Sequence, residues 1–313
     1  PAIRSAIVEL THGERRRPRR TPEVLRGALV DAMDLRNGAK LGELASVLPQ
    51  LLYDVAGHNG AMAPELIEAL FCAQVGLKNM GHRDLSREVA SLGLKVAEAQ
   101  EDPAWLGQAR LASALALPLE NAALGTKLAT AAADELQGAP GRRAKEVYGG
   151  LHLMSALHAA TALRADEATA HLAEAEGVAR SLGEPERYGD LSAAVAGNWF
   201  GPTNVDYWRT AVAAELKDTG AALVVAARIQ IGAVPIPSRH VYYWTDLARV
   251  LAADGRVLEA MQALAKAAQA APLHFRFTPI VPNLVKAWSS QAKRKADAEE
   301  IRDRARKLGI HPI

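Results

Sequence analysis

Apolar residues recur at intervals of three and four positions along most of the chain, a pattern that predicts amphipathic α-helices. The clearest stretch is 241–272, which has the form of two helices joined by a tight turn. Gly255 supplies the turn, and Pro272 marks the end of the second helix. The residues expected to face the interior of this hairpin are Trp244, Leu247, Ala248, Leu251, Ala260, Leu264 and Ala267.

These seven positions and the closing proline resemble the tetratricopeptide repeat (TPR), a helix–turn–helix unit of about 34 residues. In such a hairpin Ala248 and Ala260 lie where the two helices approach each other closely, so small side chains are expected there. The resemblance implies an all-α scaffold. It says little by itself about function, because such repeats serve many purposes.

The same periodicity predicts further helix pairs upstream. The expected pairs are 22–36 with 41–56, 64–80 with 84–99, 103–117 with 119–136, and 143–163 with 166–182. Residues 64, 103 and 141 begin successive helix pairs, so the pairs repeat about every forty residues. A steady repeat made only of helix pairs predicts an all-α fold, an α-solenoid of TPR-like hairpins.

The repeating pattern of helix pairs is interrupted after residue 183. The segment 184–202 is rich in glycine and proline and predicts an irregular break. Beyond it we expect one helical-repeat domain to continue to the C-terminus, so that residues 21–313 form roughly seven to eight helix pairs. The helices expected after the break, besides the hairpin at 241–272, are 203–218, 220–231, 279–291 and 295–308.

Residues 1–20 have a different character. A short helix is expected at 2–10, followed by the basic run GERRRPRRTP. We interpret 1–20 as a basic linker and solvated tether, with contact to phosphate or an acidic partner as the alternative. The chain begins with Pro1 rather than methionine, which indicates a piece of a longer or processed protein.

Composition narrows the class of protein. Hydrophobic residues make up 49% of the chain but aromatic residues only 5%, which suits closely packed alanine- and leucine-rich helices. No segment is apolar enough to cross a bilayer, no secretory signal is visible, and the lone Cys72 cannot form an internal disulfide, so a cytoplasmic location is expected. A net charge of +2 gives the body no nucleic-acid-binding surface by charge alone.

The C-terminal third carries a more specific resemblance. The phrases Phe200-Gly201-Pro202-Thr203-Asn204-Val205 and Leu308-Gly309-Ile310 are similar to those in the C-terminal sensor region of bacterial helix-turn-helix regulators of the XRE type. The resemblance covers about residues 20–310. It implies a sensor module of a transcriptional regulator, with DNA bound only through a separate N-terminal domain, and it allows a homodimer. The alternative is a stand-alone adaptor that scaffolds a partner protein.

Aromatic residues concentrate from Tyr188 onward. Because the first helix of each pair lines the concave face of a solenoid, aromatic and polar residues on those helices predict a groove for a small molecule or a peptide. The candidate groove residues are Asn204, Tyr207, Trp208, Tyr242, Thr245 and Arg249. Trp244 and Trp208 also fit core positions. For Tyr207, Tyr242 and Arg249 the alternative is solvent-exposed surface.

The sequence offers nothing for catalysis or metal binding. His152 and His158 lie on different faces of one expected helix, and His171 on the next helix can approach only one of them. Cys72 lies in an apolar stretch and is expected to be buried. Phosphate-binding glycine loops and nucleophile motifs are missing. We therefore expect no enzymatic activity, no metal and no cofactor.

Overall fold

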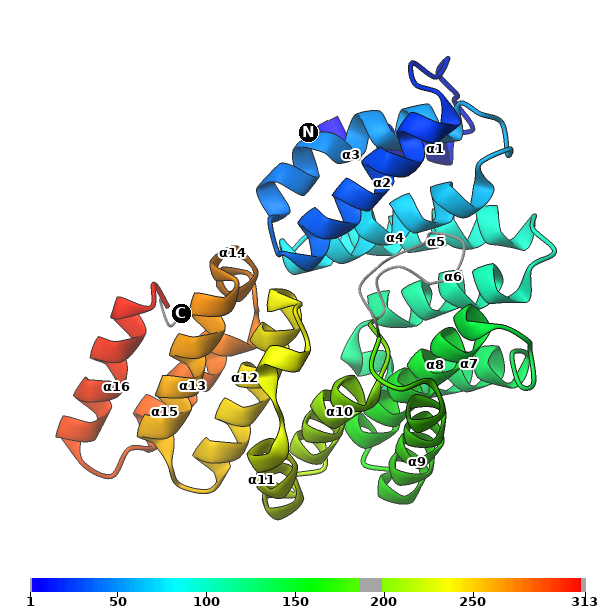
Figure 1. Ribbon diagram of the computed structural model, residues 1–313. Coiled ribbons are helices and arrows are strands. Elements are labelled where there is room, and N and C mark those ends of the chain that lie inside the picture. The colour runs from blue at the N-terminus through cyan, green and yellow to red at the C-terminus, as the bar shows by residue number, and fades with distance from the viewer. Residues whose placement is uncertain (1, 186–198, 311–313) are drawn as a thin grey trace.

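The computed structural model describes residues 2–185 and 199–310 (Figure 1). In these ranges the chain forms sixteen α-helices and two short 3-10 turns, without a β-strand. The helices pack in adjacent pairs along the chain. None of the described helices combines the length and the apolar character needed to cross a membrane.

The helix boundaries agree closely with those expected from the sequence. The N-terminal helices are α1 (Ala2–Thr11), α2 (Pro22–Asn37), α3 (Leu41–Ala56), α4 (Ala63–Asn79), α5 (Arg83–Glu98), α6 (Pro103–Ala116), α7 (Ala122–Asp134), α8 (Arg142–Thr161) and α9 (Ala165–Leu182). The C-terminal helices are α10 (Pro202–Glu215), α11 (Thr219–Arg228), α12 (Pro237–Ala253), α13 (Val257–Ala270), α14 (Pro272–Arg276), α15 (Ile280–Gln291) and α16 (Lys295–Lys307).

Local chemistry accounts for the agreement. Asp102 caps α6 by accepting a hydrogen bond from the Ala104 amide at 2.8 Å, and Asp218 caps α11 in the same way through Ala221 at 3.0 Å. One boundary differs from expectation at the end of α13. Pro272 does not simply end that helix but begins the short helix α14, since proline fits the first turn of a helix as well as it ends one.

The first helices of successive pairs also contact one another, in the order α2, α4, α6, α8, α10 and α12. Small residues allow the close approaches, as expected. Ala248 of α12 and Ala260 of α13 are both fully buried, as are Ala168 and Ala175 of α9. The predicted irregular break at 184–202 falls largely on residues 186–198, outside the described residues, as does Tyr188.

Of the first twenty residues, α1 packs against the array and the basic run touches α3, while residues 11–17 are exposed. Ile7 and Leu10 of α1 are buried in the core cluster that α2–α5 share. In the basic run, the Arg16 guanidinium stacks 3.7 Å from the Tyr53 ring centroid, and Arg20 forms a 2.7 Å ion pair with buried Asp54 of α3. The buried carboxylate requires a cationic partner, which explains why this run is folded onto α3.

The C-terminal third returns to the N-terminal third (Figure 1). We call this contact the seam; it joins Lys78, Asn79 and Gly81, at the end of α4 and after it, to Tyr242, His274 and Phe277 of α12, α14 and the following turn. The Tyr242 hydroxyl donates to Asn79 Oδ1 at 2.7 Å, and the Lys78 ammonium lies 5.3 Å from the Tyr242 ring centroid. The Phe277 ring packs on Gly81. The array therefore curves back so that the end of α4 contacts α12 and α14, with α1–α3 and α15–α16 beyond this contact.

Candidate binding site

The six predicted groove residues lie on α10 and α12, which pack side by side. The Tyr207 and Tyr243 rings stack between these helices, with centroids 5.0 Å apart and planes inclined by 22°. Asn204 accepts a hydrogen bond from Arg239 across the same interface. The structure thus brings the α10 and α12 residues into one region, but largely as contacts of one helix with the other.

Three of the six predicted groove residues are too deeply buried to contact a ligand. Asn204, Tyr207 and Thr245 are 2%, 6% and 4% exposed, and the Tyr207 hydroxyl donates to the Ile231 carbonyl at 3.3 Å. Tyr207 was expected to lie in an open groove or on the surface. Instead it is a core residue, because Tyr243 and the 230–234 connection cover its ring.

Arg249 is engaged in a charge network. It pairs with Glu215 Oε1 at 2.7 Å and with Asp246 Oδ1 at 3.2 Å, and all three side chains are about one-fifth exposed. Burial raises the pKa of Asp246 to about 6 despite the neighbouring guanidinium. This network satisfies Arg249 within the protein, so a ligand anion would have to displace two carboxylates.

The remaining two predicted residues lie at the edges of this region. Trp208 is half-buried and packs against the core clusters formed with α8 and its neighbours. Tyr242 is 41% exposed, but its hydroxyl is committed to Asn79 at the seam, and its ring meets His274 edge-on with centroids 4.8 Å apart. The six residues therefore do not line one open groove.

The segment that begins at Phe200 holds the start of α10 in place. Phe200 is buried against Gly149 of α8, where an added Cβ would lie only 2.0 Å from its ring. Pro202 begins α10, and both the amide and the hydroxyl of Thr203 donate to Glu184 Oε1, at 2.8 and 2.7 Å. These contacts fix α10 against α8 and the end of α9.

A cleft that the sequence did not predict lies between α11 and α13, with α12 as its floor. Its volume is about 350 Å³, within the range of sites that bind small molecules or peptide side chains. The lining residues are Leu223, Ala226 and Ala227 from α11, Trp244, Leu247 and Leu251 from α12, and Arg256, Glu259, Gln262, Ala263 and Lys266 from the start and body of α13.

Trp244 explains why the cleft was missed. It was expected in the core, at the aromatic position of the repeat. It contacts the C-terminal core cluster but is only half-buried, while Tyr243 is 4% exposed and fills the interior. One face of the Trp244 ring therefore stays available to the cleft. The sequence signal that could have revealed it is the polar stripe of α13 facing an aromatic residue of α12.

The charged side chains of the cleft differ in whether they have an ion-pair partner. The Lys266 ammonium lies 4.4 Å from the Trp244 ring centroid, a cation–π distance. Arg256 is held by Glu259 through two hydrogen bonds of 2.6 and 2.8 Å. Within residues 2–185 and 199–310, Lys266 forms no ion pair with a carboxylate. The cleft thus offers an apolar floor, an aromatic face and a cation that is not neutralised by a described acid.

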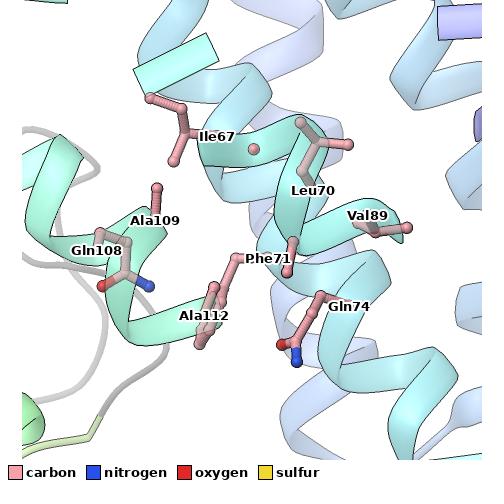
Figure 2. Close-up of a pocket in the computed structure, with 10 residues that line it drawn as sticks. Ile67, Leu70, Phe71, Gln74, Val89, Gln108, Ala109 and Ala112 are labelled. Atoms are coloured by element: carbon pink, nitrogen blue, oxygen red, sulfur yellow. The ribbon is translucent and has the colours of Figure 1, made fainter. Parts of the chain in front are cut away.

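A second cavity, between α4, α5 and α6, is too small for a ligand (Figure 2). The side chains of α4 and α6 face each other across it, among them the amides of Gln74 and Gln108, both fully buried. Its volume of about 10 Å³ matches a single water molecule. We therefore exclude it as a binding site.

Two buried ionisable side chains, Glu68 and Cys72, are unsuited to catalysis. The Arg36 guanidinium lies 3.5 Å from both Glu68 Oε1 and Cys72 Sγ. Burial raises the pKa of Glu68 to about 7 and that of the Cys72 thiol to about 12, so the thiol is neutral and cannot act as a nucleophile at neutral pH. Cys72 is buried, as expected from the sequence.

His171 does approach one of the two α8 histidines. Its Nδ1 lies 2.9 Å from His152 Nδ1, while His158 contacts the Ala114 carbonyl instead. Burial, assisted by the nearby His171, lowers the pKa of His152 to about 4. Among the described residues no three histidine, cysteine or acidic side chains converge as a metal site would require.

No protein-family model matches the chain, and neither a curated protein nor a solved structure is significantly similar to it.

Proposed function

We propose that the chain is an α-solenoid of TPR-like hairpins that acts as a binding module, and that its site is the cleft between α11 and α13. The single observation that carries the proposal is the cleft itself, with a volume of about 350 Å³, the half-buried Trp244 on its floor and Lys266 at its rim. The cleft combines an apolar floor and α11 side with a polar α13 side, so it can contact both apolar and polar groups of an occupant. The helix pairs and the contacts between successive first helices support the solenoid.

The biological setting that we propose is the sensor region of an XRE-type transcriptional regulator. The support for this setting is the resemblance of the Phe200–Val205 segment to such regulators; here Phe200 packs on Gly149 and Thr203 bonds to Glu184, contacts that hold α10 on the array. Binding in the cleft would act on a regulator by favouring one curvature of the array over another. A stand-alone adaptor would use the same cleft without the regulatory output.

Peptide selection tests the binding role. The immobilised chain is panned against a random 12-residue display library, in parallel with the variant Ala227→Trp. Ala227 lies in the cleft and is exposed, so the tryptophan fills the cleft without disturbing the core. The matched control is Ala123→Trp, at an exposed position of α7. We expect peptides that bind the parent chain and the control but not Ala227→Trp.

Gel-shift assays with the complete reading frame test the regulatory setting. A selected peptide should change the affinity of the protein for its own promoter fragment, and Ala227→Trp should abolish this change. Binding of the peptide without any effect on DNA binding would favour the adaptor. Peptides that bind Ala227→Trp as well as the parent chain would place the site elsewhere and contradict the proposal.

A further inference from the structure

We infer that the partner bound in the cleft between α11 and α13 is a peptide segment that combines apolar side chains with an acidic residue. The inference rests on the proposed function and adds the chemical class of the occupant. It is carried by the length of the cleft, by the separation of polar and apolar groups across it, and by the charge of Lys266.

The cleft is elongated along α13. Its lining residues on that side recur every three or four positions from Arg256 to Lys266, which is one face of the helix over about three turns. At 1.5 Å per residue this stripe is ~15 Å long. An extended peptide of about four or five residues spans the same distance, at ~3.3 Å per residue.

The two long sides of the cleft differ in polarity. The α11 side contributes Leu223, Ala226 and Ala227, and the α12 floor contributes Leu247 and Leu251, all of them apolar. The α13 side carries charged and amide groups along the whole stripe. An occupant must therefore be amphipathic, with apolar side chains toward α11 and α12 and polar groups toward α13.

The sign of the charge follows from the ion pairs. Glu259 is neutralised by Arg256 at 2.6 Å, whereas Lys266 is exposed, lies beside the Trp244 ring and pairs with no carboxylate in the part of the chain that the structure describes. A carboxylate on the occupant would reach Lys266 while an adjacent apolar group covers Trp244. Excluding water there strengthens the charge pair, so an acidic side chain is favoured over a basic one.

A peptide fits better than a small apolar acid. A hydrocarbon chain with one carboxylate could satisfy Lys266 and the floor, but it would cover Glu259 and Gln262 without offering them hydrogen bonds. The backbone amides of a peptide can bond to both groups along the stripe. The polar groups of the α13 side extend over ~15 Å, the length of four or five extended residues.

The experiment compares the charge of selected peptides with the charge at position 266. Selection on the parent chain should give acidic, apolar peptides whose binding is lost in Ala227→Trp. By fluorescence anisotropy, Lys266→Glu should weaken the best labelled peptide at least about tenfold, and Lys266→Arg should bind nearly as the parent does. Selection on Lys266→Glu should turn the preference to basic peptides. Lys127→Glu, an exposed charge reversal on α7, should change nothing.

The outcomes separate this inference from the proposed function. Neutral or basic peptides whose binding depends on Ala227 would overturn the inference and leave the binding role intact. The absence of any Ala227-dependent peptide would overturn both. Dodecanoate is titrated as a probe for small acids, and sedimentation tests for a second copy of the chain. Dodecanoate binding without peptide binding, or a dimer that Ala227→Trp dissociates, would overturn the inference.

Discussion

The Tyr242 hydroxyl donates a 2.7 Å hydrogen bond to Asn79 Oδ1 and so joins two residues that lie 163 positions apart in the chain. Around this bond Lys78 faces the Tyr242 ring and Phe277 covers Gly81. The contact is made by side chains at the end of α4 and on α12, and it closes the curved array. Its strength therefore sets how easily the two sides of the seam separate.

Tyr242→Phe is expected to weaken this closure without removing the ring. Loss of the hydrogen bond should lower the free energy of unfolding by about 1 kcal/mol, the usual net value for one neutral bond. Hydrogen exchange should rise at the end of α4 and in α14, and stay unchanged in α8. Tyr148→Phe is the matched control, since its hydroxyl donates to Glu174 within one helix pair. Faster exchange in α8 would argue against a local effect.

Tyr207→Ala should destabilise the protein by about 3 kcal/mol, because it empties a buried aromatic position and removes the stack on Tyr243. A groove or surface position, the two alternatives that the sequence leaves open for Tyr207, would leave stability nearly unchanged. Urea unfolding measures the difference. A variant as stable as the parent chain would restore the groove interpretation.

Acidification should destabilise the seam through His274. Burial, assisted by the nearby Lys78 ammonium, lowers the pKa of His274 to about 3. The unfolded chain takes up a proton near pH 6.5 while the folded chain resists it down to about 3, so the stabilising contribution is complete above pH 6.5. It is lost as the pH falls, at up to ~1.4 kcal/mol per pH unit.

His274→Phe keeps the ring against Tyr242 and removes the titration. Between pH 6.5 and about 4 the stability of this variant should fall less steeply than that of the parent chain, while His82→Phe, at an exposed position, should follow the parent. Urea midpoints at several pH values give both slopes. Equal slopes for parent and His274→Phe would place the acid sensitivity at other groups, of which His152 also has a lowered pKa, to about 4.

Two glycine substitutions in neighbouring helices should act in opposite directions. Gly149→Ala drives a methyl group into the Phe200 ring and should cost about 1–3 kcal/mol through overpacking. Gly177→Ala, in α9 with open space around it, should stabilise by up to ~1 kcal/mol because alanine favours the helix. Thermal unfolding distinguishes them, and a stabilising Gly149→Ala would show that Phe200 is not anchored there.

The helices could be predicted because their signals are local. Proline at the first turn, as in Pro103 after Asp102, and glycine at turns such as Gly255 act within a few residues. What such signals do not determine is which side of a helix meets which neighbour. Leu247, Ala248 and Leu251 of α12 are buried as expected, but the helix also packs against α10 and α11, and Tyr243 fills that additional interface while Trp244 stays half-buried.

The candidate site depended on contacts that are distant in sequence. Tyr207 is buried because the connection near Ile231 covers it, and Tyr242 is held because the array returns to Asn79. The cleft exists because α11 and α13, which are not consecutive, both flank α12 at a distance that leaves its surface uncovered. Residue spacing within one hairpin carries no information about these separations.

The closed seam also limits how this architecture can change in length. An open array gains or loses a hairpin at either end, or in its middle, with cost confined to the new neighbours. Here an inserted or deleted pair between α4 and α12 would carry Tyr242 away from Asn79 and expose Gly81 and Phe277 together. The number of hairpins between the two sides of the seam is thereby fixed, and changes in repeat number are restricted to the segments outside it, α1–α3 and α15–α16.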